Sequence, residues 1–142
     1  ASGFTQQIDR PPNALARIRS VAFLTYPTDP DFHAKECVMI RKGFLMSVNP
    51  DQHEEYERRH NPIWQELEDA IRAHGARNYS IFLDAEASKL FGYVEIEDEE
   101  RWAQIANTEI CKIWWAHMSE LMTSNSDNSP VIKDLREVFH ID

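Results

Sequence analysis

Residues 39–75 read MIRKGFLMSVNPDQHEEYERRHNPIWQELEDAIRAHG, and the period of the apolar side chains changes within this stretch. Its first part places apolar side chains at even positions, which is typical of a strand with one buried face: Ile40, Phe44, Met46 and Val48. From Asp51 onward they recur at three- and four-residue intervals, which predicts an amphipathic helix that ends at Gly75. The fold therefore begins with a strand and a helix.

The dipeptide Asn61-Pro62 interrupts the predicted helix. Pro62 has no N–H to donate to the carbonyl of Arg58, and it disfavours the α conformation at Asn61. The helix should kink there, or restart with Asn61 as its N-cap and Pro62 as its first residue. Either outcome places irregular backbone beside His60.

The remaining elements complete an alternating order of strands and helices. Residues 79–83 and 90–96 are predicted strands, joined into a hairpin by the turn-like segment 84–88. Asp98 should cap a helix that breaks at Asn107-Thr108 and then continues, and an alternating pattern predicts a last strand over residues 135–141. This order predicts an α+β fold of the ferredoxin-like, split βαβ type, with a four-stranded antiparallel sheet and helices on one side.

The second face of such a sheet needs a cover, and the predicted elements leave none for it. A second copy of the chain is the natural cover. We therefore expect a homodimer in which two sheets pack face to face across a two-fold axis.

Length and charge place this fold in the second part of the chain. The 142 residues suffice for one domain. Residues 1–38 hold four of the seven prolines and little periodicity, whereas residues 39–142 hold 20 of the 24 acidic side chains against 11 of the 15 basic ones. We interpret residues 1–38 as an N-terminal extension outside the core fold and residues 39–142 as the domain.

Composition also excludes several classes of partner. The net charge of −9 argues against a nucleic-acid or anionic-membrane surface. The sequence has neither an apolar run long enough to span a bilayer nor a secretory signal, and Cys37 and Cys111 show no metal or redox spacing. We expect a cytoplasmic protein with ordinary reduced thiols and a neutral small molecule as its partner.

The segment YERRHNPIW, residues 56–64, holds the first candidate for chemistry. Tyr56 and His60 are four residues apart, so on a helix they share one face. An imidazole exchanges protons near neutral pH, and a neighbouring phenol supplies a directed hydrogen bond. A histidine on a largely apolar face is also often a hydrogen-bonded core residue, so both interpretations stay open here.

The same helix offers a metal site as an alternative. His53, Glu57 and His60 recur at four- and three-residue steps and could present three ligands. No fourth ligand is marked elsewhere, and a solvated stripe of charges accounts for His53 and Glu57 equally well. We therefore expect no metal.

Trp114 and Trp115 are the second candidate, since adjacent helix positions point about 100° apart. One indole should face a cavity, where it could pack on a sugar ring and bind a hydroxyl. In the other interpretation, one tryptophan lies in the core and the other lies at the dimer contact. The polar loop over residues 125–130 suits hydroxyl binding or an ordinary turn. With only four glycines, no phosphate loop and no nucleophile elbow, the sequence indicates no cofactor.

Taken in order, the motifs of residues 39–142 resemble the L-rhamnose mutarotase family. These motifs are MIRKGF (39–44), NPD (49–51), HEEY (53–56), RRHNPIW (58–64), HGA (74–76), EERW (99–102), WW (114–115) and DNSP (127–130). The resemblance implies a dimeric α+β barrel and an isomerase of the aldose 1-epimerase type that interconverts the anomers of L-rhamnose without cofactor or metal. It implies His60 as the general acid. It also implies four residues that contact the sugar: Tyr56, Tyr79, Trp114 and Trp115.

Two other functions remain open at this stage. One fold hosts many chemistries, so a cofactor-free monooxygenase-like or decarboxylase-like enzyme of the same barrel architecture is the second hypothesis. A non-catalytic sugar-binding module that uses the same cleft is the third. Family members begin at the position of Met39, so residues 1–38 depart from the family pattern.

Overall fold

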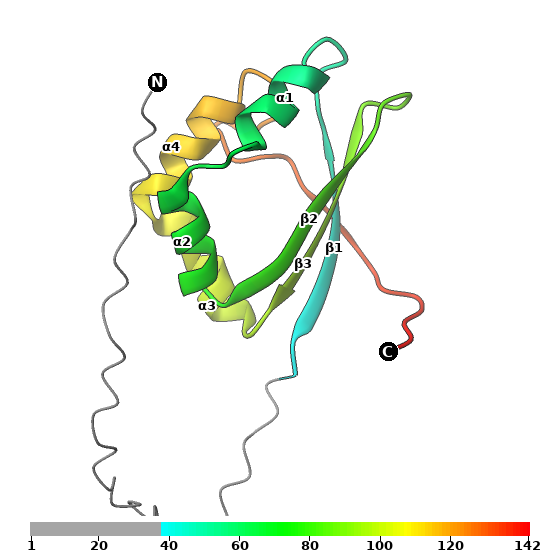
Figure 1. Ribbon diagram of the computed structural model, residues 1–142, viewed down its shortest axis with the longest axis vertical. Coiled ribbons are helices and arrows are strands. Elements are labelled where there is room, and N and C mark those ends of the chain that lie inside the picture. The colour runs from blue at the N-terminus through cyan, green and yellow to red at the C-terminus, as the bar shows by residue number, and fades with distance from the viewer. Residues whose placement is uncertain (1–37) are drawn as a thin grey trace, which may run out of the picture. The chain divides into compact units, whose positions relative to one another are not determined.

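The computed structural model describes residues 38–142 (Figure 1). Apart from Val38, the extension predicted over residues 1–38 lies outside the described residues, as does Cys37.

Four strands form one antiparallel sheet in the order β2-β3-β1-β4. Their bounds are Ile40–Ser47 for β1, Ala76–Asp84 for β2, Lys89–Ile96 for β3 and Lys133–Leu135 for β4. This is the strand order of the split βαβ topology, so the predicted fold class is confirmed.

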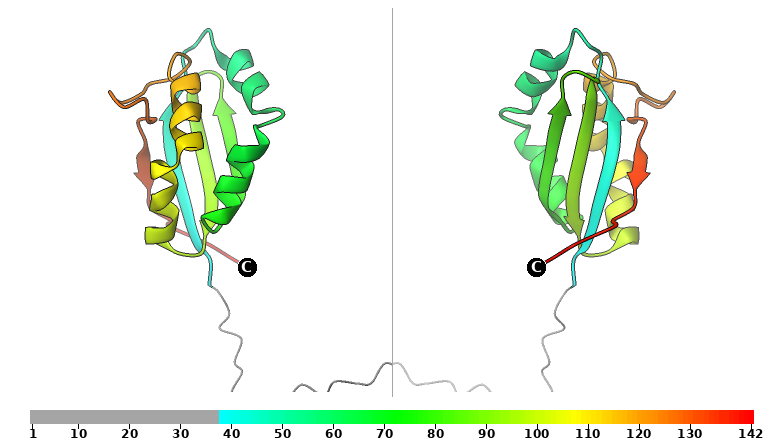
Figure 2. Two further views of the ribbon diagram at one scale, coloured as in Figure 1. Left: turned by 90° about the vertical axis from the view of Figure 1, so that its left-hand side faces the viewer. Right: turned by 90° about the vertical axis from the view of Figure 1, so that its right-hand side faces the viewer.

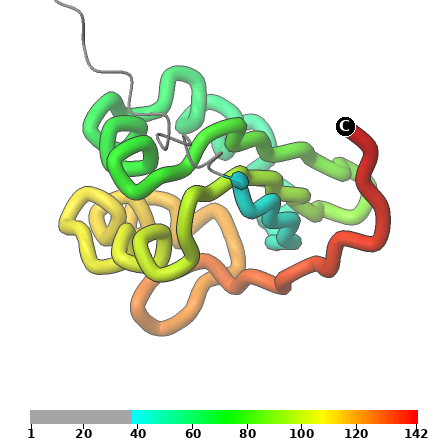
Figure 3. Tube along the Cα trace, turned by 90° about the horizontal axis from the view of Figure 1, so that it is seen from below, coloured from blue at the N-terminus to red at the C-terminus, as the bar shows by residue number. Residues whose placement is uncertain are grey.

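The helices all lie on one side of this sheet (Figures 1 and 2). They are α1 (His53–His60), α2 (Gln65–Ala73), α3 (Glu99–Ala103), the 3₁₀ turn η1 (Gln104–Asn107) and α4 (Glu109–Met118). Seen from below, the helices and the strands form two layers, and the chain after β4 lies on the side of the sheet away from the helices (Figure 3). Within residues 38–142, no helix is long and apolar enough to cross a membrane.

Three predicted helix boundaries are confirmed by their caps. The Asp98 carboxylate accepts a hydrogen bond from the N–H of Arg101 (2.8 Å) and begins α3. The Thr108 hydroxyl accepts from the N–H of Cys111 and begins α4. Gly75 follows the end of α2 with φ of +81°, a left-handed conformation that glycine adopts without strain.

The interruption at Asn61-Pro62 is also confirmed, but Asn61 does not cap the second helix. Asn61 ends α1 in an extended conformation, as expected before a proline, and its side chain donates to the carbonyl of Glu57 (3.0 Å). Helix α2 begins later, with Trp64 as its N-cap. Asn61 lies three residues before this N-cap, so its side chain stands outside the first turn of α2 and closes α1 instead.

The last strand is shorter than predicted. Strand β4 pairs with β1 only over Lys133–Leu135, so the prediction of a strand over residues 135–141 was wrong beyond Leu135. Phe139 and Ile141 alternate in the sequence but are both largely exposed. Alternation fixes a strand only where one face is buried, and no described part of the chain buries these side chains.

The core fills the space between the sheet and the helices, with Leu90, Val94 and Ile96 of β3 at its centre. Phe44 of β1 lies opposite Gly92 of β3. A Cβ atom on Gly92 would lie only 2.1 Å from the Phe44 ring, so this glycine allows the ring to lie directly on the backbone of β3.

A β-bulge in β2 reverses which side chains face the helices. Ala76 pairs with Ile96 and is buried under the helices, but the register shifts between Arg77 and Ser80. Asn78 sits in this bulge with a φ of 48°. Beyond it the odd-numbered residues face the helices, because Ile81 and Leu83 pair with the buried Gly92 and Leu90. Tyr79 therefore joins the helix side.

The opposite face of the sheet carries an apolar row. Phe82, Phe91 and Leu45 lie side by side on β2, β3 and β1, because both Phe82 and Leu45 pair with Phe91. Phe82 is 64% exposed and Phe91 is 43% exposed. No helix among the described elements covers this face (Figure 2).

Candidate active site

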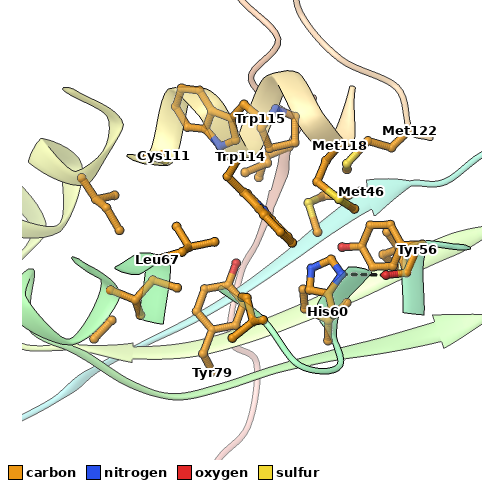
Figure 4. A pocket seen from close by; sticks show the side chains of 18 of the residues that line it. Met46, Tyr56, His60, Leu67, Tyr79, Cys111, Trp114, Trp115, Met118 and Met122 are labelled. Atoms are coloured by element: carbon orange, nitrogen blue, oxygen red, sulfur yellow. Dashed lines mark hydrogen bonds between the residues drawn. The ribbon is translucent and has the colours of Figure 1, made fainter. Parts of the chain in front are cut away.

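A cavity of about 1080 Å³ opens between the helices and the sheet (Figure 4). Aliphatic, aromatic and methionine side chains make up much of its lining. All five residues predicted for the site line this cavity: Tyr56, His60, Tyr79, Trp114 and Trp115. They come from α1, β2 and α4, so the fold gathers residues that are far apart in the sequence.

His60 ends α1, and its ring is held in one orientation. Its Nδ1 lies 2.8 Å from the carbonyl oxygen of Tyr56. A carbonyl only accepts, so Nδ1 carries the proton, and Nε2 is the nitrogen left for a ligand. The ring stacks on Tyr56, with 4.4 Å between ring centroids, and meets Trp114 edge-on at 5.1 Å. Burial lowers the pKa of His60 below 6.5, and the hydrogen bond to the backbone only partly opposes this shift.

Tyr56 packs beneath that imidazole as a buried residue of α1. Burial raises the pKa of its phenol well above the usual 10, so Tyr56 stays neutral at physiological pH. A neutral hydroxyl both donates and accepts hydrogen bonds, as an uncharged sugar requires.

Tyr79 reaches the cavity because of the bulge in β2. The residue is 39% exposed, on the edge strand of the sheet, but its hydroxyl end points into the cavity (Figure 4). Burial of that hydroxyl raises the pKa of Tyr79 to about 12. The ring meets Phe44 and Trp102 edge-on, with centroids 6.0 and 6.4 Å away. Gly92 thus supports Tyr79 indirectly, through the position of the Phe44 ring.

Trp114 and Trp115 both contribute to the lining, although only one indole was expected to face a cavity. Trp114 is buried and meets Trp64 edge-on at 5.0 Å, in addition to His60. His117 packs behind this pair, 5.0 Å from the ring of Trp64. Trp114 is therefore part of the core and of the cavity wall at the same time.

Several lining residues were not singled out from the sequence. Trp102 was assigned only to a helix, and the buried thiol of Cys111, whose pKa burial raises to about 11, was treated as ordinary. Asn128 and Ser129 of the polar loop also line the cavity, which agrees with one of its two interpretations. No pattern in the sequence marks Trp102, because a tryptophan on an amphipathic helix usually serves the core.

The three-ligand metal alternative has no geometric support. His53 Nε2 lies 2.9 Å from the Ser88 hydroxyl, and Glu57 is exposed. Within residues 38–142, no three His, Cys, Asp or Glu side chains are grouped as metal ligands.

Comparisons with known proteins agree on one family. The family model described as L-rhamnose mutarotase matches residues 41–141. The L-rhamnose mutarotase of Tolumonas auensis is 61% identical over 103 residues, which cover 72% of this chain and 99% of that protein. The crystal structure of an L-rhamnose mutarotase from Formosa agariphila is 38% identical, with a TM-score of 0.67, and covers 72% of this chain and 99% of that one.

A more distant likeness concerns the fold alone. A putative antibiotic biosynthesis monooxygenase from Caulobacter crescentus has a TM-score of 0.51 at 19% identity, and the match covers 71% of this chain and 91% of that one.

Proposed function

Because this chain belongs to the L-rhamnose mutarotase family, we propose that its cavity binds L-rhamnose and that the protein acts there as an isomerase, interconverting the α and β anomers. The observation that carries the proposal is the imidazole of His60, whose Nδ1 is bound to the backbone while a phenol and an indole enclose its ring. This leaves Nε2 available on the side of the cavity.

The reaction needs only proton transfers. The ring opens when a proton reaches the ring oxygen and another leaves the anomeric hydroxyl. The freed aldehyde then rotates, and the C5 hydroxyl closes on its other face. In our proposal, protonated His60 delivers its Nε2 proton to the ring oxygen, and a water molecule takes the proton of the anomeric hydroxyl. On closure His60 takes its proton back from the C5 hydroxyl and water returns a proton to the aldehyde oxygen, so the enzyme returns to its starting state. The chemistry calls for neither a cofactor nor a metal.

The other four residues hold the sugar in this proposal. Tyr56 and Tyr79 bind hydroxyls through neutral phenols, because burial keeps both pKa values high. Trp114 and Trp115 pack on the C–H face of the pyranose and on its methyl group. A lining that is largely apolar with a few directed polar groups suits a 6-deoxy sugar.

The test is saturation-transfer NMR between the two anomer signals of L-rhamnose. The protein should raise the exchange rate above that of buffer, and His60→Ala should lower its contribution by at least about tenfold. His74→Ala is the matched control, since His74 Nδ1 lies 2.6 Å from the carbonyl oxygen of Ala70 in the same helical geometry, but His74 does not line the cavity. Exchange at the buffer rate in the parent protein would remove the proposal.

The same experiment separates the other hypotheses. Binding of L-rhamnose without any exchange in the parent would favour a non-catalytic sugar-binding module. Turnover of aromatic or polyketide-like substrates, with none of sugars, would favour the monooxygenase-like enzyme. Only a similarity of fold supports the monooxygenase-like enzyme.

A homodimer is the second part of the proposal. Leu45, Phe82 and Phe91 form a contiguous apolar row, whereas single exposed apolar residues scattered over a surface need no explanation. Burial of this row against the same row of a second copy would give a dimeric α+β barrel. The row supplies the self-complementary patch that a two-fold axis needs.

The location of the activity within the chain and the cell completes the proposal. We place the mutarotase domain in residues 39–142, with residues 1–38 as an extension, because the family match begins at residue 41. We also propose a cytoplasmic protein, since Cys111 is a free, buried thiol and thiols stay reduced in that compartment.

A further inference from the structure

Helix α1 carries two of the proposed site residues, yet it buries very little apolar surface. Tyr56 is its only buried residue, and every other residue of α1 is charged or a histidine. In most helices the burial of an apolar stripe fixes the orientation. With one tyrosine as its only buried residue, α1 depends more than most helices on polar contacts to hold it, and with it His60, in place.

Arg59 supplies the strongest of these contacts. Its side chain is only 12% exposed, and its guanidinium binds three acceptors. Nε donates to Glu55 within α1 (2.7 Å), Nη2 donates to Glu120 just after α4 (2.5 Å), and Nη1 donates to the carbonyl of His117. The planar fork of an arginine suits such a multiple contact, whereas a lysine is a single compact charge.

The acceptors on the far side belong to the end of α4. The carbonyl of His117 lies in the last turn of that helix, where unpaired carbonyl groups carry partial negative charge. Helix α4 also holds Trp114, the indole that stands against His60. Arg59 therefore connects α1, which carries His60, to α4, which carries the Trp114 indole that packs against His60.

We propose that Arg59 is a positioning residue, which holds α1 against α4 and thereby fixes Nε2 of His60 in the cavity. Arg59 does not line the cavity, so it acts through its neighbour and not on the sugar. This inference rests on the proposed function for its kinetic readout, but its structural part is independent of that function.

Arg58 provides a matched control one residue earlier. It donates to the same Glu55 carboxylate, from Nε at 2.7 Å and from Nη2 at 2.6 Å. Its side chain is 71% exposed, however, and none of its hydrogen bonds reaches α4. Arg58→Met and Arg59→Met both remove a positive charge and a pair with Glu55, and only the second removes the connection between the helices.

The kinetic experiment compares these variants by anomer-exchange NMR over a range of L-rhamnose concentrations. Arg59→Met should lower kcat by at least about tenfold with a smaller change in KM. A displaced His60 transfers its proton more slowly, whereas the other residues of the cavity still bind the sugar. Arg59→Lys should recover only part of the loss, and Arg58→Met should stay within about twofold of the parent. Equal kcat values for the two Met variants, both folded, would overturn the proposal.

A spectroscopic experiment tests the same point without turnover. In long-range ¹H–¹⁵N spectra, the parent should show His60 with its proton on Nδ1, as the bond to Tyr56 requires. Arg59→Met should shift or broaden these signals, and Arg58→Met should leave them unchanged. If the parent shows no anomer exchange, the proposed function fails, and this readout still decides the role of Arg59.

Glu120→Gln is the fallback if Arg59→Met does not fold. It removes the charge of one acceptor on the α4 side and leaves the guanidinium and Glu55 in place. We expect kcat to fall about threefold, and the His60 signals to shift, through loss of a charge-assisted hydrogen bond. A variant identical to the parent in both readouts would contradict the proposal.

Discussion

At the scale of single residues, the decisive feature is the asymmetry of the two nitrogens of His60. The backbone carbonyl of Tyr56 occupies Nδ1, and the cavity lies on the side of Nε2. Burial favours the neutral ring, so protonated His60 is a minor species at neutral pH but a stronger acid than an exposed imidazolium.

The direction of the pH dependence follows from this assignment. If His60 acts as the acid, kcat/KM falls as pH rises through the pKa of the free enzyme, which burial places below 6.5. The measurement is the NMR exchange rate between about pH 5 and 8, corrected for the buffer rate at each pH. A rate that rises with pH over this range would instead make the free lone pair of Nε2 a base.

The residues of the site were predictable to different degrees. A helical spacing of four places Tyr56 and His60 on one face, and the structure has them stacked. The role of Tyr79 was inferred only from the family resemblance. The alternating pattern around Tyr79 does not distinguish a residue that lines a cavity from a residue of the core. Trp102 was missed for the same reason.

At the scale of elements, the bulge in β2 determines whether Tyr79 can reach the cavity. Without the extra residue, the burial of Ala76 would continue at Asn78 and turn Tyr79 to the opposite face. The alternation of residues 79, 81 and 83 was visible in the sequence. The register shift before them was not, because it depends on how β2 pairs with β3.

Substitution of Asn78 tests this role of the bulge. Asn78 has a φ of 48°, which a β-branched residue tolerates poorly, at a cost of about 1–2 kcal/mol. We expect Asn78→Val to raise KM for L-rhamnose several-fold, as the hydroxyl of Tyr79 loses its position. Asn78→Gly keeps the backbone conformation and loses only the hydrogen bond to Glu95 (2.8 Å), so its KM should stay close to the parent value. Similar KM values for both variants would show that the bulge does not depend on this residue.

The boundaries of most elements could be predicted because caps and breakers are local signals, as at Asp98 and Gly75. The end of the last strand, β4, could not be predicted in this way. Strand formation after Leu135 would need a partner along β1, and the pairing stops at Gly43. Local sequence does not contain that information.

At the scale of the whole molecule, the two faces of the sheet differ sharply. One face lies under the helices and encloses the cavity, and the other presents the row of Leu45, Phe82 and Phe91. The predicted antiparallel sheet with helices on one side already required such an uncovered face. We propose a second copy of the chain as the cover of this face.

Charge placed in that row should prevent the proposed dimer. Phe91→Asp puts a carboxylate at the centre of the row, where burial without a partner is unfavourable. Sedimentation velocity should show a dimer for the parent and a monomer for this variant. Ile113→Asp is the control, since Ile113 is an exposed apolar residue on α4, in the helix layer. A monomeric parent, or a dimeric Phe91→Asp variant, would contradict the proposed assembly.

The irregular ladder of β2 has one more consequence, for solubility. Strand β2 is an edge of the sheet, and a regular edge invites strand addition by other molecules. The twist that Asn78 introduces breaks the even row of N–H and C=O groups on which such growth depends. We therefore expect the distortion that aims the Tyr79 hydroxyl at the cavity also to hinder the addition of other strands at this edge.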